Sequence, residues 1–192
     1  MSMDLPDFSS VLKVVLDEAG SLLERVDKKA LSGLLQEVAS DWKGRRLFFW
    51  ARGRSFLILK AFAMRLMHLG YRVHIVGEVD CPSIGKGDIL VVASGSGATS
   101  SVLLFSEKAK KFGARVVAFT GKVNTPLAKV ADLVVPLKSE DAPPSVQLFA
   151  NGSGTRFEDA LFILFDACIL YLIWDRKEEA YLEMMRRHAN LE

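Results

Sequence analysis

Residues 89–99 read Ile-Leu-Val-Val-Ala-Ser-Gly-Ser-Gly-Ala-Thr, a short aliphatic run that ends in a loop of glycines and hydroxyls. A helical pattern over residues 99–112 follows at once. A short apolar run before glycines and a helix is typical of a buried parallel strand that leads into a helix N-terminus. The stretch therefore predicts an α/β fold with a binding loop at the end of a strand.

This loop, residues 94–99, is suited to bind an anion. Unpaired N–H groups and the positive end of the helix dipole both face a loop of this kind. Ser94, Ser96 and Thr99 add hydroxyl donors, and Gly95 and Gly97 allow a close backbone approach. Because no lysine lies inside the loop, it is not a Walker P-loop and it favours a small phosphate ester over a nucleoside triphosphate. The alternative is a glycine- and serine-rich connection that binds nothing.

The rest of the chain alternates between strand and helix patterns. The expected strands are residues 47–51, 71–76, 88–93, 115–119 and 133–136, and the expected helices are residues 8–18, 21–39, 56–69, 99–112, 125–130, 156–174 and 177–187. The alternation predicts right-handed βαβ crossovers and a parallel sheet. Gly20 and Ser21 indicate a break between the first two helices. Residues 138–155 have no pattern, which is typical of a functional or disordered loop.

The composition limits the classes of function. The 192 residues include 25 basic and 23 acidic side chains, and a net charge of +2 gives no argument for nucleic acid or a membrane as partner. Cys81 and Cys168 form neither a metal-ligand spacing nor a disulfide framework, so reduced thiols in a cytoplasmic protein are expected. No metal site and no cofactor are predicted. The most apolar segment, residues 160–174, is too short to span a bilayer.

Two loops are expected at the carboxyl ends of parallel strands, where open α/β sheets bind ligands. They are residues 53–55 (Gly-Arg-Ser) and residues 94–99. If the two preceding strands are neighbours, both loops can hold one phosphate, and Arg54 can add a charge-assisted contact. A solvated loop arginine is the alternative for Arg54.

Other ionisable residues have two interpretations each. Glu158 stands at the start of an apolar helix, where it is either a helix cap or a general base beside the ligand. His68 and His74 fall on core-like elements and are expected to be structural. His188 lies near the C-terminus, where the spacing alone favours a frayed tail.

Several motifs together resemble one known family. They are Gly53-Arg54-Ser55, Val76-Gly77-Glu78, the 94–99 loop, residues 61–70 (Ala-Phe-Ala-Met-Arg-Leu-Met-His-Leu-Gly), residues 154–158 (Gly-Thr-Arg-Phe-Glu) and residues 187–192 (Arg-His-Ala-Asn-Leu-Glu). The chain resembles the sugar isomerase (SIS) domain family over nearly its whole length. The 94–99 loop alone indicates only a SIS domain, whereas residues 61–70 and 187–192 together point to the 6-phospho-3-hexuloisomerase branch.

The resemblance implies a flavodoxin-like, three-layer α/β/α sandwich with a five-stranded parallel sheet. It implies a single SIS domain over residues 1–192, with residues 8–39 and 156–187 as packing or oligomer elements of a homotetramer. It also implies substrate contacts and a proton acceptor, Glu158, with His188 reaching a neighbour's active site. The implied substrate contacts are Arg54, Ser55, Ser94, Gly95, Ser96, Gly97, Ala98 and Thr99. The family has glycine where this chain has Phe56, so a narrower pocket is expected.

The implied activity is a cofactor-free interconversion of D-arabino-3-hexulose 6-phosphate and fructose 6-phosphate, in the ribulose monophosphate pathway of formaldehyde fixation. The partner is then a small sugar phosphate. Moving the carbonyl from C3 to C2 requires loss of the C2 proton, a cis-enediolate and reprotonation at C3, and one carboxylate can make both transfers. The alternatives are another SIS sugar-phosphate isomerase, a non-catalytic sugar-phosphate-binding regulator, and a flavodoxin-like nucleotide binder. The last is disfavoured because no GxGxxG motif is present.

Overall fold

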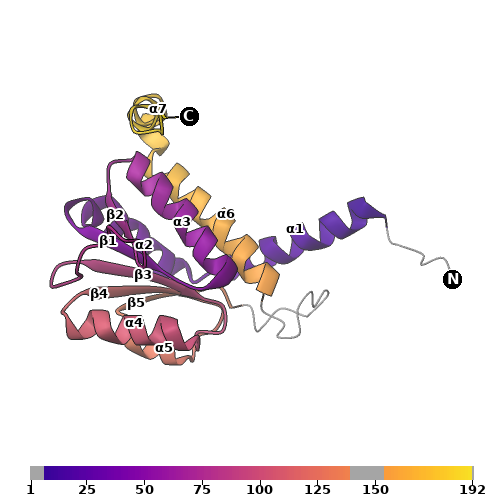
Figure 1. Ribbon diagram of the computed structural model, residues 1–192. Coiled ribbons are helices and arrows are strands. Elements are labelled where there is room, and N and C mark those ends of the chain that lie inside the picture. The colour runs from indigo at the N-terminus through magenta and orange to yellow at the C-terminus, as the bar shows by residue number, and fades with distance from the viewer. Residues whose placement is uncertain (1–6, 139–153, 192) are drawn as a thin grey trace.

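The computed structural model describes residues 7–138 and 154–191, which form a three-layer α/β/α sandwich (Figure 1). The central sheet has five parallel strands in the order β2-β1-β3-β4-β5, which is the flavodoxin-like order. The strands are β1 (Arg46–Trp50), β2 (Arg72–Ile75), β3 (Ile89–Ser94), β4 (Arg115–Thr120) and β5 (Leu133–Pro136). The predicted parallel α/β fold is confirmed.

Helices cover both faces of this sheet. They are α1 (Phe8–Glu24), α2 (Lys28–Ser40), η1 (Trp42–Gly44), α3 (Gly53–His68), α4 (Ser100–Lys111), α5 (Pro126–Val130), α6 (Gly154–Leu172), η3 (Trp174–Arg176) and α7 (Lys177–Arg186). The core on one face is shared with α2, α3 and α6, and the core on the other face with α4 and α5. The first turns of α1 project away from the body (Figure 1). In the part of the chain that the structure describes, no helix is long and apolar enough to cross a membrane.

Burial on both faces explains why the strands lack polar alternation. Phe49 and Val91 face the core shared with α3 and α6, whereas Phe48 and Leu90 face the core under α4. Every residue of β3 is buried. A strand covered on both sides gains from apolar residues at every position, so a continuous hydrophobic run is the expected pattern.

Two predicted helix boundaries were wrong. α1 continues through Gly20 to Glu24, and the break comes instead at Asp27, whose carboxylate accepts hydrogen bonds from the N–H groups of Lys29 (2.9 Å) and Ala30 (3.0 Å). A capping aspartate defines a helix start strongly, whereas one interior glycine costs only about 1 kcal/mol. α3 begins at Gly53 rather than at residue 56. Of the unpatterned segment predicted over residues 138–155, residues 139–153 lie outside the described residues. Residues 154 and 155 are helical, so α6 runs over Gly154–Leu172 rather than over the predicted 156–174.

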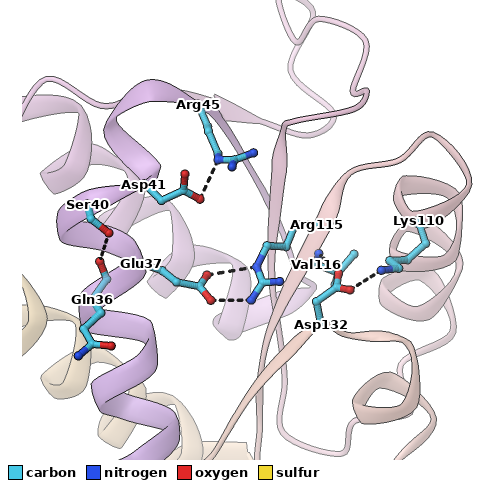
Figure 2. A network of polar contacts seen from close by, with 9 residues as sticks. All are labelled: Gln36, Glu37, Ser40, Asp41, Arg45, Lys110, Arg115, Val116 and Asp132. Carbon is cyan, nitrogen blue, oxygen red and sulfur yellow. Dashed lines mark hydrogen bonds and ion pairs between the residues drawn. The ribbon is translucent and has the colours of Figure 1, made fainter.

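The amino ends of β4 and β5 are joined to neighbouring helices by ion pairs (Figure 2). Arg115, at the start of β4, makes a two-pronged contact with Glu37 of α2, at 2.5 and 3.2 Å. Asp132, just before β5, pairs with Lys110 of α4 and accepts the Val116 N–H at 2.8 Å. These charges compensate one another, so they fasten helices to the sheet at the end opposite the predicted site.

Candidate active site

The carboxyl ends of β1 and β3 form the topological switch point of the sheet. The two strands are hydrogen-bonded neighbours, with Trp50 in register with Val92. β2 lies beyond β1 on one side, and β4 lies beyond β3 on the other. Open α/β sheets bind ligands at such a point. The condition for both loops to hold one phosphate, that the strands before them are neighbours, is therefore met.

The helices that begin at the switch point differ in capping from the others nearby. α1, α2 and α5 each have a side-chain cap, from Asp7, Asp27 and Thr125. Within residues 7–138 and 154–191, no side chain makes a cap hydrogen bond to α3 or α4. Their first N–H groups and the positive ends of their dipoles therefore remain available for an anion.

Hydroxyl groups organise the 94–99 loop. Ser94 Oγ lies 2.9 Å from Thr99 Oγ1 and 3.4 Å from Ser96 Oγ. The Gly97 N–H donates to Ser94 Oγ at 3.1 Å, and the Ala98 N–H donates to Ser96 Oγ at 3.2 Å. These bonds bring the three predicted hydroxyl donors into one cluster. Each hydroxyl can rotate to donate to an oxygen of the same phosphate group.

The glycines of this loop allow it to pack tightly. Gly97 has φ +62°, and a Cβ there would lie 2.5 Å from the Cβ and Cγ2 of Thr125, the residue that caps α5. A Cβ on Gly95 would lie 3.3 Å from the Phe157 ring. Position 97 therefore requires glycine, because its φ angle is positive and because Thr125 leaves no room for a Cβ atom. The loop is seated between α5 and α6.

Three consecutive residues of α6 connect the two candidate loops. The buried Phe157 ring lies against Gly95. Glu158 Oε1 accepts a hydrogen bond from Ser55 Oγ at 2.6 Å. Asp159 Oδ1 pairs with Arg54 Nη2 at 3.0 Å. The early part of α6 thus contacts the start of α3 and the loop after β3.

Glu158 has the environment of a base. Its side chain is buried with only 7% exposure, and this burial raises the pKa of Glu158, opposed by the Ser55 hydrogen bond and the Arg54 charge. Oε2 is also buried, and no described residue makes a hydrogen bond to it. One oxygen is therefore fixed and the other is free to accept a proton. α6 has no acidic residue in its first turn, which disfavours the capping interpretation of Glu158.

The predicted site residues do not all meet. Arg54, Ser55, the 94–99 loop and Glu158 lie at one end of the sheet, whereas His188 lies beyond α7 at the other end of α3 (Figure 1). The His188 ring stacks on that of His68, with centroids 5.3 Å apart. Ser55 and His68 stand near opposite ends of α3, roughly 20 Å apart at about 1.5 Å per residue. Within one chain, His188 is thus remote from Glu158.

Sequence reasoning missed two residues at this site, Phe157 and Asp159. The only signal for Asp159 in the sequence is that it is a second carboxylate directly after Glu158. Its pairing with Arg54 joins positions 105 residues apart, which a local pattern does not reveal.

The Phe56 ring packs edge-on to Trp50 at 5.1 Å and lies under Lys60 Nζ at 4.8 Å. The narrowing of the pocket by Phe56 stays a prediction. Among the described residues, no group of three or more His, Cys, Asp or Glu side chains is placed to hold a metal ion.

The chain is similar to known proteins in both sequence and structure. The SIS domain model matches residues 42–153. A 3-hexulose-6-phosphate isomerase of Mycobacterium gastri is 39% identical over 97% of this chain and 92% of its own length, and one of Methylomonas aminofaciens is 42% identical over 77% and 81%. A solved hypothetical protein of Methanococcus jannaschii, for which a 3-hexulose-6-phosphate isomerase function was inferred, has 32% identity and a TM-score of 0.76, covering 95% of this chain and 99% of that one.

Proposed function

Because this chain belongs to the SIS domain family, we propose that it is a sugar-phosphate isomerase that interconverts D-arabino-3-hexulose 6-phosphate and fructose 6-phosphate. Its similarity to proteins named 3-hexulose-6-phosphate isomerase extends over nearly its whole length. The sugar phosphate is the partner, and a cytoplasmic location is part of the proposal, in keeping with two free cysteines, Cys81 and Cys168.

The phosphate on C6 is the proposed anchor of the substrate. The hydroxyls of Ser94, Ser96 and Thr99 and the N-termini of α3 and α4 bind its oxygens, and Arg54 adds a cation. Support for this assignment comes from the clustered hydroxyls, and from α3 and α4 having no side-chain cap in the described part of the chain. An anchored phosphate leaves the C2–C3 end of the sugar to meet a base.

Glu158 is the proposed base, and Oε2 is the atom that carries the proton. Oε2 takes the proton from C2, the electron pair moves into the C2–C3 bond, and the C3 carbonyl oxygen becomes the enediolate oxygen. The proton on the C2 hydroxyl passes to the oxygen on C3, Oε2 returns its proton to C3, and the carbonyl is left at C2. In this scheme Ser55 holds Oε1 and orients the carboxylate rather than binding phosphate.

One observation carries this proposal: Glu158 is a buried carboxylate at the switch point, with Oε1 held by Ser55 and Oε2 left unpaired by the residues that the structure describes. A buried unpaired carboxylate oxygen is costly. A protein that only binds sugar phosphates gains nothing from that cost, whereas a general base near neutral pH benefits from a raised pKa.

The proposal extends to assembly as a homotetramer in which His188 of one subunit reaches the site of another. The support is twofold. His188 is exposed and remote from Glu158 of its own chain. Large apolar side chains of α6 are exposed, namely Phe162, Ile163, Leu170 and Tyr171. A histidine there would donate to the developing enediolate oxygen.

The direct test is a coupled assay for fructose 6-phosphate formed from D-arabino-3-hexulose 6-phosphate, run beside a panel of other sugar phosphates. We expect turnover of the 3-hexulose ester and much slower turnover of the others. Turnover of a different ester alone would make the protein another SIS isomerase. Tight binding without turnover of any ester would instead indicate a regulator.

A further inference from the structure

Two adjacent residues of α3 pair with two adjacent residues of α6, and the two pairs differ in depth. Ser55 and Glu158 form the inner pair, with both side chains buried. Arg54 and Asp159 form the outer pair, in which the side chains are 52% and 29% exposed. The Arg54 guanidinium is thus held toward solvent by Asp159. The residue next to Asp159 is Glu158, a buried carboxylate whose Oε2 no described residue binds.

That free oxygen is a natural partner for the same guanidinium. Arginine matches a carboxylate with two parallel N–H···O bonds, and Glu158 offers Oε2 unpaired. The Arg54 charge already acts on Glu158: burial raises its pKa most, while Arg54 lowers it and the negative charge of Asp159 raises it. An arginine paired with Glu158 would occupy the proton-accepting oxygen and weaken the base.

We propose that Asp159 is a positioning residue, which holds the Arg54 guanidinium at the open edge of the site and keeps it away from the free oxygen of Glu158. The inference rests on the proposed function, in which Glu158 accepts a proton while Arg54 meets a phosphate. Asp159 need not touch the substrate, since it acts through Arg54.

The exposure of the outer pair suits this role. An exposed ion pair contributes little net stability, so a doubly charged phosphate can share or replace Asp159 as the partner of Arg54 at small cost. Among the described residues, the charged groups that act on Glu158 are Arg54 from α3 and Asp159 from α6, beside hydrogen bonds from the neutral Ser55 hydroxyl and the Glu158 backbone. The 94–99 loop, which meets the preceding residue Phe157, carries no charged side chain.

The first test needs no substrate. The Glu158 carboxyl is titrated by carbon-13 NMR in the ligand-free full chain, in wild type, Asp159→Asn, Arg54→Gln and the double variant, with Glu158→Gln to assign the signal. We expect Asp159→Asn to lower the pKa of Glu158 strongly when Arg54 is present and less in the Arg54→Gln background. Equal shifts in both backgrounds would mean that Asp159 acts only through its own charge, which would overturn the proposal.

The second test follows turnover against pH. Asp159→Asn is expected to move the acidic limb of kcat/KM to lower pH and to reduce kcat by about tenfold, short of the 10²–10⁴ of a lost base. KM is expected to change less than kcat, and Asp159→Glu should restore the wild-type profile in part. A profile that stays at its wild-type position in Asp159→Asn would overturn the proposal.

The matched control is Glu107→Gln, which removes an exposed carboxylate from α4, on the opposite face of the sheet. It should leave both the Glu158 titration and the pH profile unchanged. If Asp159→Asn fails to fold, as judged by its melting curve, Asp159→Ser takes its place in both tests. A wild-type protein without isomerase turnover refutes the proposed function, whereas the NMR titration still decides the role of Asp159.

Discussion

Glu158 provides the most direct prediction at the scale of single residues. Glu158→Gln keeps the shape of the side chain and can still accept from Ser55, but it cannot take a proton. We expect kcat to fall by about 10²–10⁴, the usual effect of a lost general base, with fructose 6-phosphate affinity retained. Turnover and calorimetric binding measure the two quantities. Near-native turnover would transfer the role of base to His188, whose glutamine variant should then be inactive.

The raised pKa of Glu158 also predicts how stability depends on pH. The folded-state pKa lies above the ordinary value of 4.5, so the stability gained from the protonated form is complete below 4.5 and is lost as the pH rises through the folded-state pKa. Glu158→Gln cannot ionise and escapes this loss. The melting temperature of Glu158→Gln relative to wild type should therefore increase over that pH window, and a difference independent of pH would contradict the prediction.

The sequence reveals some site residues better than others, because some depend on local patterns and others on contacts between residues far apart in the chain. The 94–99 loop and Glu158 stand next to strong local signals, a glycine-rich turn and an apolar helix. The pairing of Arg54 with Asp159 depends on how α3 and α6 cross, which no local pattern encodes. The family resemblance implies Ser55 as a substrate contact, whereas in the fold its hydroxyl donates to Glu158, 103 residues away in the sequence.

At the scale of elements, the 94–99 loop is expected to bind the phosphate. The double variant Ser94→Ala with Ser96→Ala should weaken binding of fructose 6-phosphate by roughly 1–3 kcal/mol, the cost of lost hydrogen bonds to a charged group. Calorimetry measures this, and normal affinity would exclude the loop as the phosphate site. Because Ser94 is buried and accepts from the Gly97 N–H, about 1 kcal/mol of stability should also be lost.

The same loop makes a prediction about Gly97. An alanine there meets a left-handed backbone angle and the side chain of Thr125, so Gly97→Ala should cost about 1–3 kcal/mol of unfolding free energy. Gly85→Ala is the matched control, since a Cβ at Gly85 meets nothing within 4 Å. Denaturant unfolding compares the two. Equal stability of both variants would show that the loop relaxes freely.

The elements themselves follow closely from the sequence where burial is complete. β1 was predicted over residues 47–51 and runs over Arg46–Trp50, because a strand buried on both faces is a continuous apolar run. The break between α1 and α2 was not predicted correctly. Gly20 suggested the end of the first helix, whereas the break lies near Asp27, seven residues later, which caps the start of α2.

At the scale of the whole molecule, the exposed apolar residues of α6 predict an oligomer. Light scattering at micromolar concentration should give the mass of a tetramer, and a stable monomer would contradict the assembly.

If His188 serves a neighbouring site, then Glu158→Gln and His188→Gln should each be inactive alone. After subunit exchange, a mixture should recover activity, up to about a quarter of the sites for random pairing. An inactive mixture would exclude a shared site.

The distribution of charge in the molecule has a consequence for ionic strength. The proposed phosphate site relies on neutral hydroxyls and helix N-termini, and Arg54, the cation assigned to it, is already paired with Asp159. Long-range attraction of the substrate is therefore weak, and short hydrogen bonds are little screened by salt. Raising salt from about 0.01 M to about 0.15 M shortens the Debye length from about 30 Å to about 8 Å, yet KM should barely change. Such a site is expected to discriminate against polyanions, because its hydroxyls and helix N-termini bind one phosphate group and provide no partner for additional negative charges on the ligand.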